Sequence, residues 1–414
     1  MEVQLTQEKE NKRKSSSGDA LSIVMISMSR WDGPFSSASI SLAKEFAKTH
    51  KVYYVDHPLT LLDIWKSRKL PMLKHRLKAL FLGKDSLTSI SNNLAAFCPY
   101  FVFPVNWLPK GFLYKWANQL NNYIFFKSLK RLLKEEKVED FIFFNSYNPF
   151  YGYELPEDIR PAKFVYQSRD DISESLYVAK HGVTLEKQVI LNADKVMATS
   201  SYLARKITPK NGKYVHHLPN SADLSLFDHE ALKSCPKPDD IAAITKPIVL
   251  YTGNIQLRIN YDLLYNTALN HPDKQFVMIG PRNDKGHHKL DFDSLSNVSF
   301  LGAKPIDQLG YYMAHADCAI IPFKCNELTR SIYPLKVNEY LAMGLPVVST
   351  NFSEDISRFE KVVYLAEDSV TSFSDLINRA IAENGMVKVE QRKEVAKQNT
   401  WSKRVEQFWE LLEA

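Results

Sequence analysis

Residues 326–350 hold the most informative set of chemically active side chains in this 414-residue chain, NELTRSIYPLKVNEYLAMGLPVVST. Pro334 can begin a helix because its missing N–H would have no partner there, so Lys336 lies in the first turn beside unpaired amides. A lysine at the positive end of a helix suits a phosphate or a diphosphate. Glu339 follows on nearly the same face, where a carboxylate can accept both hydroxyls of a ribose, and Gly344 ends the helix.

Two neighbouring aspartates form a second candidate site. Asp170 and Asp171 close the run FVYQSRDD at the carboxyl end of a predicted buried strand. Adjacent carboxylates repel each other and raise the pKa of one of them, whereas Arg169 favours the ionised form of the nearer one. One aspartate of the pair is therefore suited to act as a general base near neutral pH. The alternative interpretation is an N-cap and a surface charge for the helix that follows.

Short β-rich runs separated by helical patterns must position these residues. Most runs hold four to six apolar residues, which is typical of strands covered on both faces of a parallel sheet. Because they alternate with helical spacing, the sequence predicts two doubly wound α/β sheets. The predicted strands are 22–27, 51–56, 140–145, 163–168, 195–200 and 213–217, and then 247–252, 275–280, 297–301, 318–323, 346–350 and 361–365.

The two series of strands predict two domains. Residues 1–20 are polar and charged without the apolar run of a signal peptide, and we expect a flexible tail there. Residues 21–220 form the N-terminal domain, 221–246 a proline-containing linker, and 247–399 the C-terminal domain. Residues 400–414 carry apolar side chains at helical spacing and predict a helix that packs on the N-terminal domain. Since parallel sheets bind ligands beyond the carboxyl ends of their strands, the two domains are expected to face a cleft.

The composition excludes several classes of protein. Glycine is scarce: 14 of the 414 residues are glycine, about 3%, where roughly 7% is typical. No two glycines are separated by a single residue. The GxGxxG dinucleotide motif is therefore absent. The GxxxxGK[ST] phosphate loop, GxSxG and HExxH are absent as well. These absences argue against the commonest dehydrogenases, nucleoside triphosphatases and hydrolases.

Neither the cysteines nor the histidines predict a metal site. The four cysteines show no CxxC spacing, which favours reduced thiols in the cytoplasm. The adjacent pairs His216-His217 and His287-His288 point to opposite faces if they lie on strands, so they do not favour a shared metal. One DxD triplet, from Asp291 to Asp293, lies in a polar loop before a strand rather than after one. We expect neither a metal nor another cofactor.

Residues 326–350 resemble the GT-B nucleotide-sugar glycosyltransferases, especially a bacterial group with a PLKxxEYLAxGxPVVST segment, and are similar to teichuronic acid and exopolysaccharide glycosyltransferases. Pro219-Asn220 followed by Asp223 and Phe227 resembles the PNGVDxxxF linker of these enzymes, although Ser221 replaces the glycine. The resemblance covers residues 251–366 strongly, from YTGN through FVMIGP and NVSFLG. It covers 22–56 more weakly, with SRWDG and VYYVD.

The resemblance implies the GT-B fold, with acceptor binding in the N-terminal domain and donor binding in the C-terminal one. The implied donor diphosphate lies between Lys336, Arg258 and the backbone around Thr329, with Gly253 and Asn254 in the adjacent loop and Glu339 on the ribose. Inverting members use a carboxylate of the N-terminal domain as the base, which implies this role for Asp170 or Asp171. Arg30, Trp31 and Asp32, in the loop after the first strand, form a candidate wall of the acceptor site.

One feature departs from the family pattern. Many retaining members carry two glutamates eight residues apart, but Ser331 stands eight residues before Glu339. Glu327 lies nearby at a different spacing. The sequence therefore leaves the choice between inversion and retention of the anomeric configuration open. It also leaves open whether Arg258 binds a ligand or is a solvated loop arginine.

The net charge of +6 is unevenly distributed. Residues 1–220 hold 32 basic and 21 acidic residues, a net +11, whereas residues 221–414 hold 21 and 26, a net −5. Most of the excess lies in residues 59–138, where basic residues are mixed with Trp, Leu and Phe at roughly helical spacing. Such a surface can lie on an anionic membrane leaflet. The alternatives are a solvated helix face and a nucleic-acid patch, and no nucleic-acid-binding motif supports the latter.

The sequence therefore predicts a glycosyltransferase that moves a sugar from a nucleotide diphosphate sugar to a hydroxyl of a glycan or lipid-linked acceptor, in bacterial cell-surface polysaccharide synthesis. We expect it in the cytoplasm, at the inner face of the membrane. A nucleotide-sugar 2-epimerase and a non-catalytic nucleotide-sugar binding protein are the alternatives. The sugar, the nucleotide base, the acceptor and the oligomeric state are not determined by the sequence.

Overall fold

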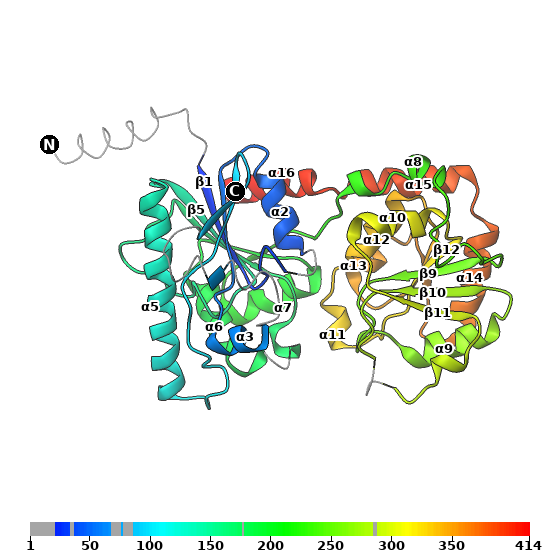
Figure 1. The fold of residues 1–414 in the computed structure, drawn as a ribbon, viewed down its shortest axis with the longest axis horizontal. Helices are drawn as coiled ribbons and strands as arrows, with labels where there is room; N and C mark the ends of the chain where they lie inside the picture. The colour runs from blue at the N-terminus through cyan, green and yellow to red at the C-terminus, as the bar shows by residue number, and fades with distance from the viewer. Residues whose placement is uncertain (1–20, 34–36, 68–75, 78–85, 176–177, 285–287) are drawn as a thin grey trace. The chain divides into compact units, whose positions relative to one another are not determined.

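A computed structural model describes residues 21–33, 37–67, 76–77, 86–175, 178–284 and 288–414. The predicted tail at 1–20, His287 and much of the basic stretch at 68–85 lie outside the described residues. The chain divides into two compact units (Figure 1). The first holds residues up to Gln167 and the segment that ends at Val196, and the second holds Ser168–Ser175 and Met197–Ala414.

The first sheet has eight strands in the order β3-β4-β2-β1-β5-β6-β7-β8. β1 pairs in parallel with β2 and β5, and β2 with β4, whereas β3 and β4 are antiparallel. Its strands are Ser22–Ser27 (β1), Val52–Val55 (β2), Leu87–Ser91 (β3), Leu94–Phe97 (β4), Phe141–Ser146 (β5), Lys163–Ser168 (β6), Lys195–Ala198 (β7) and Val215–His217 (β8). The helices are Ala38–Phe46 (α2), Leu61–Ser67 (α3), Phe112–Glu135 (α5), Ala179–Asn192 (α6) and Ser201–Asn211 (α7).

The second sheet has six strands in the order β11-β10-β9-β12-β13-β14, and all five pairings are parallel. Its strands are Ile248–Thr252 (β9), Gln275–Ile279 (β10), Val298–Gly302 (β11), Cys318–Ile321 (β12), Val347–Thr350 (β13) and Tyr364–Ala366 (β14). The helices are His229–Lys233 (α8), Tyr261–Asn270 (α9), Ile306–Ala314 (α10), Glu327–Arg330 (α11), Leu335–Ala342 (α12), Glu354–Ser357 (α13), Val370–Ala382 (α14), Met386–Lys397 (α15) and Trp401–Glu413 (α16).

Local sequence explains many of these boundaries. Ser37, Ser200 and Asn260 each accept a backbone N–H with the side chain and so begin α2, α7 and α9. Gly344, with φ 66°, is left-handed and follows α12, at the helix end that the sequence predicted. Helices lie on both sides of the second sheet, with α10 and α12 on one side and α9 on the other (Figure 1). Two parallel-sheet α/β units are what the sequence predicted.

The sequence prediction was wrong in two places. It missed β3 and β4, because β3 is a mostly exposed run, LTSIS, that carries no continuous apolar stretch. The last predicted strand, 361–365, forms at Tyr364–Ala366 instead, because Val362 and Val363 are held in turns by hydrogen bonds to the carbonyl of Phe359. In the part of the chain that the structure describes, no helix is both long and apolar enough to cross a membrane.

Candidate donor and acceptor sites

The carboxyl ends of β9 and β10 bring two glycine loops together. Gly253 follows β9 with φ 125°, and Gly280 follows β10 with φ 150°. A Cβ atom built on Gly280 would lie 2.0 Å from the carbonyl oxygen of Gly253. Only a residue without a side chain allows this approach. Gly253 itself lies beside Lys336, at the start of α12.

Lys336 reaches this glycine loop from the second position of α12. Its Nζ lies 3.4 Å from the Tyr251 hydroxyl and 4.7 Å from the ring centroids of both Tyr251 and Phe323. A Cβ on Gly253 would lie 3.2 Å from Lys336 Nζ. Burial is the main reason that the pKa of Lys336 is lowered to about 8; the nearby Glu339 carboxylate opposes this shift, and the charge of Arg258 adds to it. The ammonium group thus lies at the loop against a hydroxyl, two aromatic rings and the glycine backbone.

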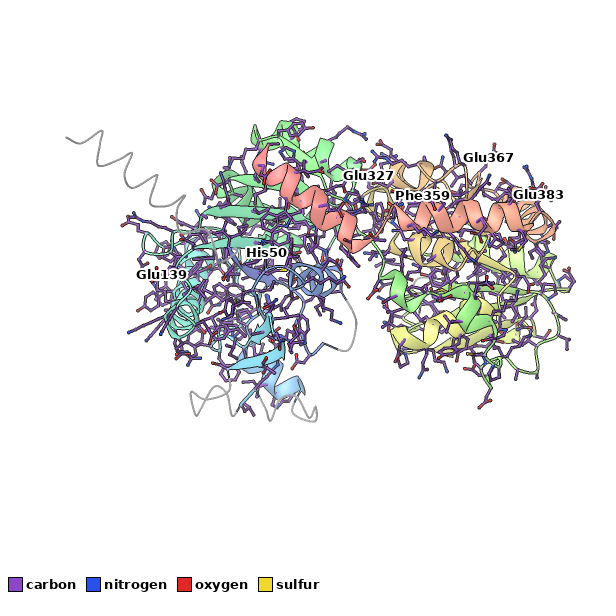
Figure 2. The ribbon with its side chains drawn as sticks, turned by 90° about the horizontal axis from the view of Figure 1, so that it is seen from above. His50, Glu139, Glu327, Phe359, Glu367 and Glu383 are labelled. Carbon is purple, nitrogen blue, oxygen red and sulfur yellow. The ribbon has the colours of Figure 1, made fainter. Side chains whose placement is uncertain are left out.

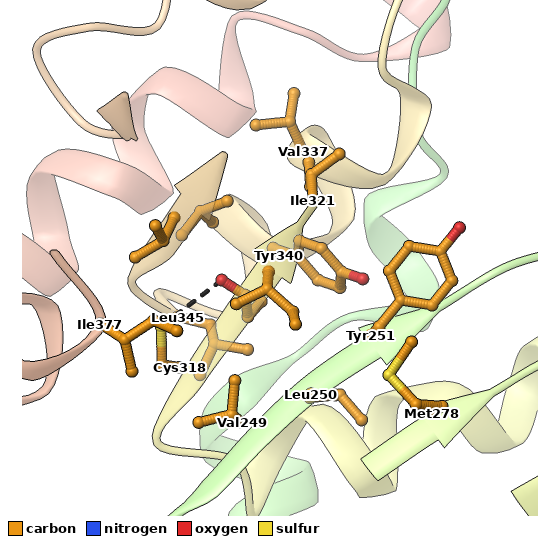
Figure 3. Packing of buried hydrophobic residues seen from close by; sticks show 14 of the residues in the cluster. Val249, Leu250, Tyr251, Met278, Cys318, Ile321, Val337, Tyr340, Leu345 and Ile377 are labelled. Carbon is orange, nitrogen blue, oxygen red and sulfur yellow. Dashed lines mark hydrogen bonds between the residues drawn. The ribbon is translucent and has the colours of Figure 1, made fainter. Parts of the chain in front are cut away.

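Tyr340 fixes the position of α12 against the sheet. Its hydroxyl accepts the backbone N–H of Thr252 at 2.8 Å and lies 3.0 Å from Thr252 Oγ1, at the end of β9. Figure 3 shows Tyr340 and Tyr251 within the buried cluster that surrounds this point. Glu339 precedes Tyr340 on the same helix, and burial raises its pKa while Lys336 lowers it. The buried hydrogen bond between Tyr340 and Thr252 thus fixes the helix that carries Lys336 and Glu339 next to the Gly253 loop.

Arg258 joins the same site from the loop after β9. It is half-exposed, and its charge contributes to lowering the pKa of Lys336. Its Nη2 lies 3.8 Å from Oδ1 of Asp170, a residue of the Ser168–Ser175 segment that belongs to the second unit. The structure therefore brings Gly253, Lys336, Glu339 and Arg258 together and places Asp170 beside Arg258.

The two adjacent aspartates differ in their surroundings. Asp171 is buried, accepts from the backbone N–H and hydroxyl of Ser173, and pairs with Lys206. Burial raises the pKa of Asp171, but its hydrogen bonds with Lys206 and Ser173 lower it below its usual value. The raised pKa expected for one carboxylate therefore does not arise at Asp171, because Lys206 compensates the charge. Asp170 instead leaves 45% of its side chain exposed.

Thr329, which the sequence predicted to contact the donor, forms its hydrogen bonds with protein groups at the start of α11. It is fully buried, its N–H donates to Asn326 Oδ1 at 3.1 Å, and its hydroxyl donates to the carbonyl of Lys324. Glu327, labelled in Figure 2, accepts from Arg330 and from the hydroxyl of Tyr202. Asn254 is exposed, and its carbonyl accepts from the Tyr251 hydroxyl. Ser331 is buried and bonds the carbonyl of Leu328.

The predicted acceptor-side residues have separate environments in the first unit. Asp32 pairs with the buried Arg76, which also binds Asp56 at 2.7 Å. Trp31 donates its backbone N–H to the Asp56 carboxylate and packs its ring edge-on against Tyr54. Arg30 alone of the three lines a cavity of about 440 Å³. The sequence analysis missed the other polar residues of this cavity, such as His57 and Asn118, because they come from segments far apart in the chain.

Two of the metal candidates, Asp293 and His288, have protein partners. Asp293 pairs with Arg282 at 2.7 Å, and His288 lies 3.1 Å from Asp284. Within the described ranges, no group of three or more His, Cys, Asp or Glu side chains is arranged to hold a metal ion. The four cysteines form no disulfide bond.

Comparison with known proteins identifies the domain around Lys336. Residues 246–383 match the family described as glycosyl transferases group 1. This part of the chain is therefore similar to a group 1 glycosyltransferase domain. Gly253, Asn254, Arg258, Thr329, Lys336 and Glu339 all lie inside the matched region, whereas Asp170 and Arg30 lie outside it.

Similarity to individual proteins extends beyond this glycosyltransferase domain. The chain is 26% identical over 224 residues to TuaH of Bacillus subtilis (strain 168), which bears the name teichuronic acid biosynthesis glycosyltransferase. The match covers 52% of this chain and 56% of TuaH. Sucrose-phosphate synthase from Thermosynechococcus elongatus matches with a TM-score of 0.68 at 14% identity, over 95% of this chain and 98% of that one. Anabaena HepE, solved with UDP and glucose, matches with a TM-score of 0.63 at 13% identity, over 95% and 100%. These structural matches show the GT-B fold.

Proposed function

We propose that this protein is a glycosyltransferase that moves a sugar from a nucleotide diphosphate sugar to a hydroxyl of a glycan or lipid-linked acceptor. The observation that carries the proposal is the position of Lys336 Nζ against the Gly253 loop, within the group 1 domain and near Arg258. Similarity to TuaH favours a role in bacterial cell-surface polysaccharide synthesis. HepE was solved with UDP and glucose, which favours the same kind of donor here.

The roles of the residues follow from their charge and position. The acceptor oxygen attacks the anomeric carbon of the donor, and its proton passes to Asp170, the more exposed of the two aspartates. The bond between the anomeric carbon and the diphosphate oxygen breaks, and its electron pair leaves with the diphosphate. Lys336 and Arg258 stabilise that developing charge, and Glu339 binds the ribose hydroxyls. Gly253, which has no side chain, leaves room for the diphosphate beside Lys336, and Asn254 follows it in the same loop.

A screen of nucleotides tests the donor assignment. A ligand that binds only the folded protein raises its thermal midpoint by mass action. We expect a nucleoside diphosphate and its sugar conjugate to raise the midpoint of the full chain, and the corresponding nucleoside to leave it unchanged. Failure of every common nucleoside diphosphate and nucleotide sugar would exclude the donor site. Turnover of the identified donor without any acceptor would instead indicate an epimerase, and binding without turnover for any acceptor would indicate a binding protein.

We also propose that the outer face of α5 contacts an anionic membrane. Phe112 and Trp116 lie in its first turns with 83% and 56% of their surfaces exposed, and Tyr123 is also exposed. Lys115 and Lys127 are exposed on the same helix. Apolar rings insert at the boundary between headgroups and acyl chains, while lysines are attracted to anionic lipids, so this combination favours a membrane over a solvated face.

Vesicle flotation checks this surface. We expect more protein to float with vesicles that contain anionic lipid than with neutral ones, and high salt to reduce the difference. The double variant Phe112→Ala/Trp116→Ala should lose most of the recovery. Tyr214→Ala, which removes an exposed ring from the second unit, should retain it. Equal recovery from neutral and anionic vesicles would contradict the proposal.

A further inference from the structure

The 440 Å³ cavity of the first unit lies at the carboxyl ends of its central strands. Arg30 follows β1, His57 follows β2, and Tyr151 follows β5. The carboxyl edge of a parallel sheet is where α/β proteins bind their ligands. The volume falls in the range of small-molecule sites, about 300–1,000 Å³.

Asn148 fixes the hydrogen-bonding state of His57 in this cavity. Its amide oxygen accepts the backbone N–H groups of Phe150 and Tyr151, and its amide nitrogen donates to the carbonyl of Ser27. That nitrogen also lies 3.3 Å from His57 Nδ1, which must therefore accept, leaving the imidazole proton on Nε2. Burial, with a smaller contribution from the charge of Arg30, lowers the pKa of His57 to about 3 although Asp63 opposes the shift, so the ring stays neutral.

The polar groups of the cavity balance one another in charge. Arg30 donates to the backbone carbonyls of His57 and Pro58 and pairs with Asp63 at 3.3 Å. A diphosphate in this cavity would meet Asp63 directly, and the single cation there is already paired. Neutral His57 and the Asn118 amide add uncharged hydrogen-bonding groups. A neutral head rich in hydroxyls, which both donate and accept, fits this set better than an anion does.

The cavity opens past three exposed apolar side chains, here called the apolar rim. They are Leu62, Phe103 and Trp107, which expose 48%, 49% and 70% of their surfaces. Isolated exposed apolar residues are common, but a group of them at the mouth of one cavity marks a binding surface.

The segment that carries two of the rim residues is held in place by hydrogen bonds. Asn121 accepts the N–H of Phe103 at 2.8 Å and donates to its carbonyl at 2.9 Å. Lys180 donates to the carbonyl of Trp107, and His181 donates to that of Leu108. Because this segment is already ordered, a ligand loses little conformational entropy on binding there, as expected of a preorganised site.

We infer that this cavity binds the neutral sugar head of an amphiphilic acceptor whose apolar chain leaves over Leu62, Phe103 and Trp107. The inference rests on the proposed function, which it narrows to a lipid-linked acceptor rather than a free glycan. Neutral hydrogen-bonding groups inside and apolar side chains at the mouth match the two ends of such a molecule.

Binding of alkyl glycosides to the full chain tests the inference without any donor. Calorimetry compares n-octyl β-D-glucopyranoside, below its critical micelle concentration, with methyl β-D-glucopyranoside, and the galactoside and N-acetylglucosaminide pairs in the same way. For at least one head group we expect the octyl compound to bind about tenfold or more tightly, because methylenes are buried on the rim. Equal affinities within every pair, or no binding of any compound, would overturn the inference.

Three variants locate the effect. Trp107→Ala should reduce the preference for the octyl chain to about threefold or less and leave the methyl glycoside unchanged. Arg30→Gln should weaken both compounds by the same factor, since it contacts the head. Tyr214→Ala removes an exposed ring that does not line the cavity, and it should change neither affinity. An octyl preference that survives Trp107→Ala unchanged would overturn the assignment of the rim.

The result is independent of the donor screen. A chain preference together with no nucleotide binding supports this inference and overturns the proposed function. Nucleotide binding together with equal glycoside affinities overturns this inference and leaves the proposed function in place.

Discussion

Asp170→Asn is expected to lower the turnover number of sugar transfer by about 10²–10⁴-fold, the usual contribution of a general base. Asparagine keeps the shape of the side chain but cannot take the proton of the attacking hydroxyl. Because Asp170 lies 3.8 Å from Arg258, removing its charge leaves that guanidinium more available to the diphosphate. The affinity for UDP, or for whichever nucleoside diphosphate the screen identifies, should therefore stay the same or increase. Turnover is measured as nucleoside diphosphate released in the presence of acceptor.

Two matched variants separate a base from a structural carboxylate. Asp291→Asn, in an exposed loop, should leave turnover within about twofold and also tests the DxD triplet as a metal ligand. Asp171→Asn removes the partner of Lys206, so it should mainly lower stability. The pKa of Asp171 is lowered in the folded state, so its contribution to stability is present above its ordinary value and is lost as the pH falls. Wild-type turnover in both the Asp170 and the Asp171 variants would place the base elsewhere.

Lys336→Ala is expected to weaken binding of the nucleoside diphosphate at least about tenfold, since a charged hydrogen bond contributes about 1.5–3 kcal/mol. The ammonium group lies against the Gly253 loop. Lys361→Ala, which removes an exposed lysine from the same unit, is the matched control and should leave the affinity unchanged. Calorimetric titration gives both values, and equal affinity of Lys336→Ala and wild type would exclude the diphosphate assignment.

The pH dependence of binding provides a second readout of Lys336. Burial lowers the pKa of its ammonium group to about 8 in the free protein, so it is charged below pH 8 and loses its proton above it. The diphosphate, whose last ionisation lies near about pH 6, is fully charged throughout that range. Affinity should therefore fall up to tenfold per pH unit above 8 in wild type and in Lys361→Ala, but not in Lys336→Ala. A flat profile to pH 10 in wild type would show that the lysine is not the titrating contact.

Much of the α/β order was readable from local patterns. Strands such as Ile248–Thr252 are continuous apolar runs because both of their faces are covered, and that requirement is visible in any window of the sequence. Lys336 and Glu339 share a helix face through spacing alone, and Gly344 marks the end of that helix. The β3–β4 pair was not readable, because LTSIS becomes a strand only by pairing with β4, which itself pairs with β2. Strand formation of this kind depends on tertiary contacts rather than on local composition.

The choice between candidate site residues that are neighbours in the sequence depended on the folded structure. Asp170 and Asp171 are adjacent and chemically identical, yet Lys206, 35 residues after Asp171, pairs with one of them. Arg30 lines the cavity, whereas Asp32 forms an ion pair with Arg76, 44 residues away in the sequence. Residue types and spacing along one helix or strand are local properties, so the donor motif and the order of elements follow from the amino-acid sequence. The burial and the partners of a side chain depend on segments brought together by packing, so the choice between the two aspartates and the cavity of the first unit emerge only from the three-dimensional arrangement.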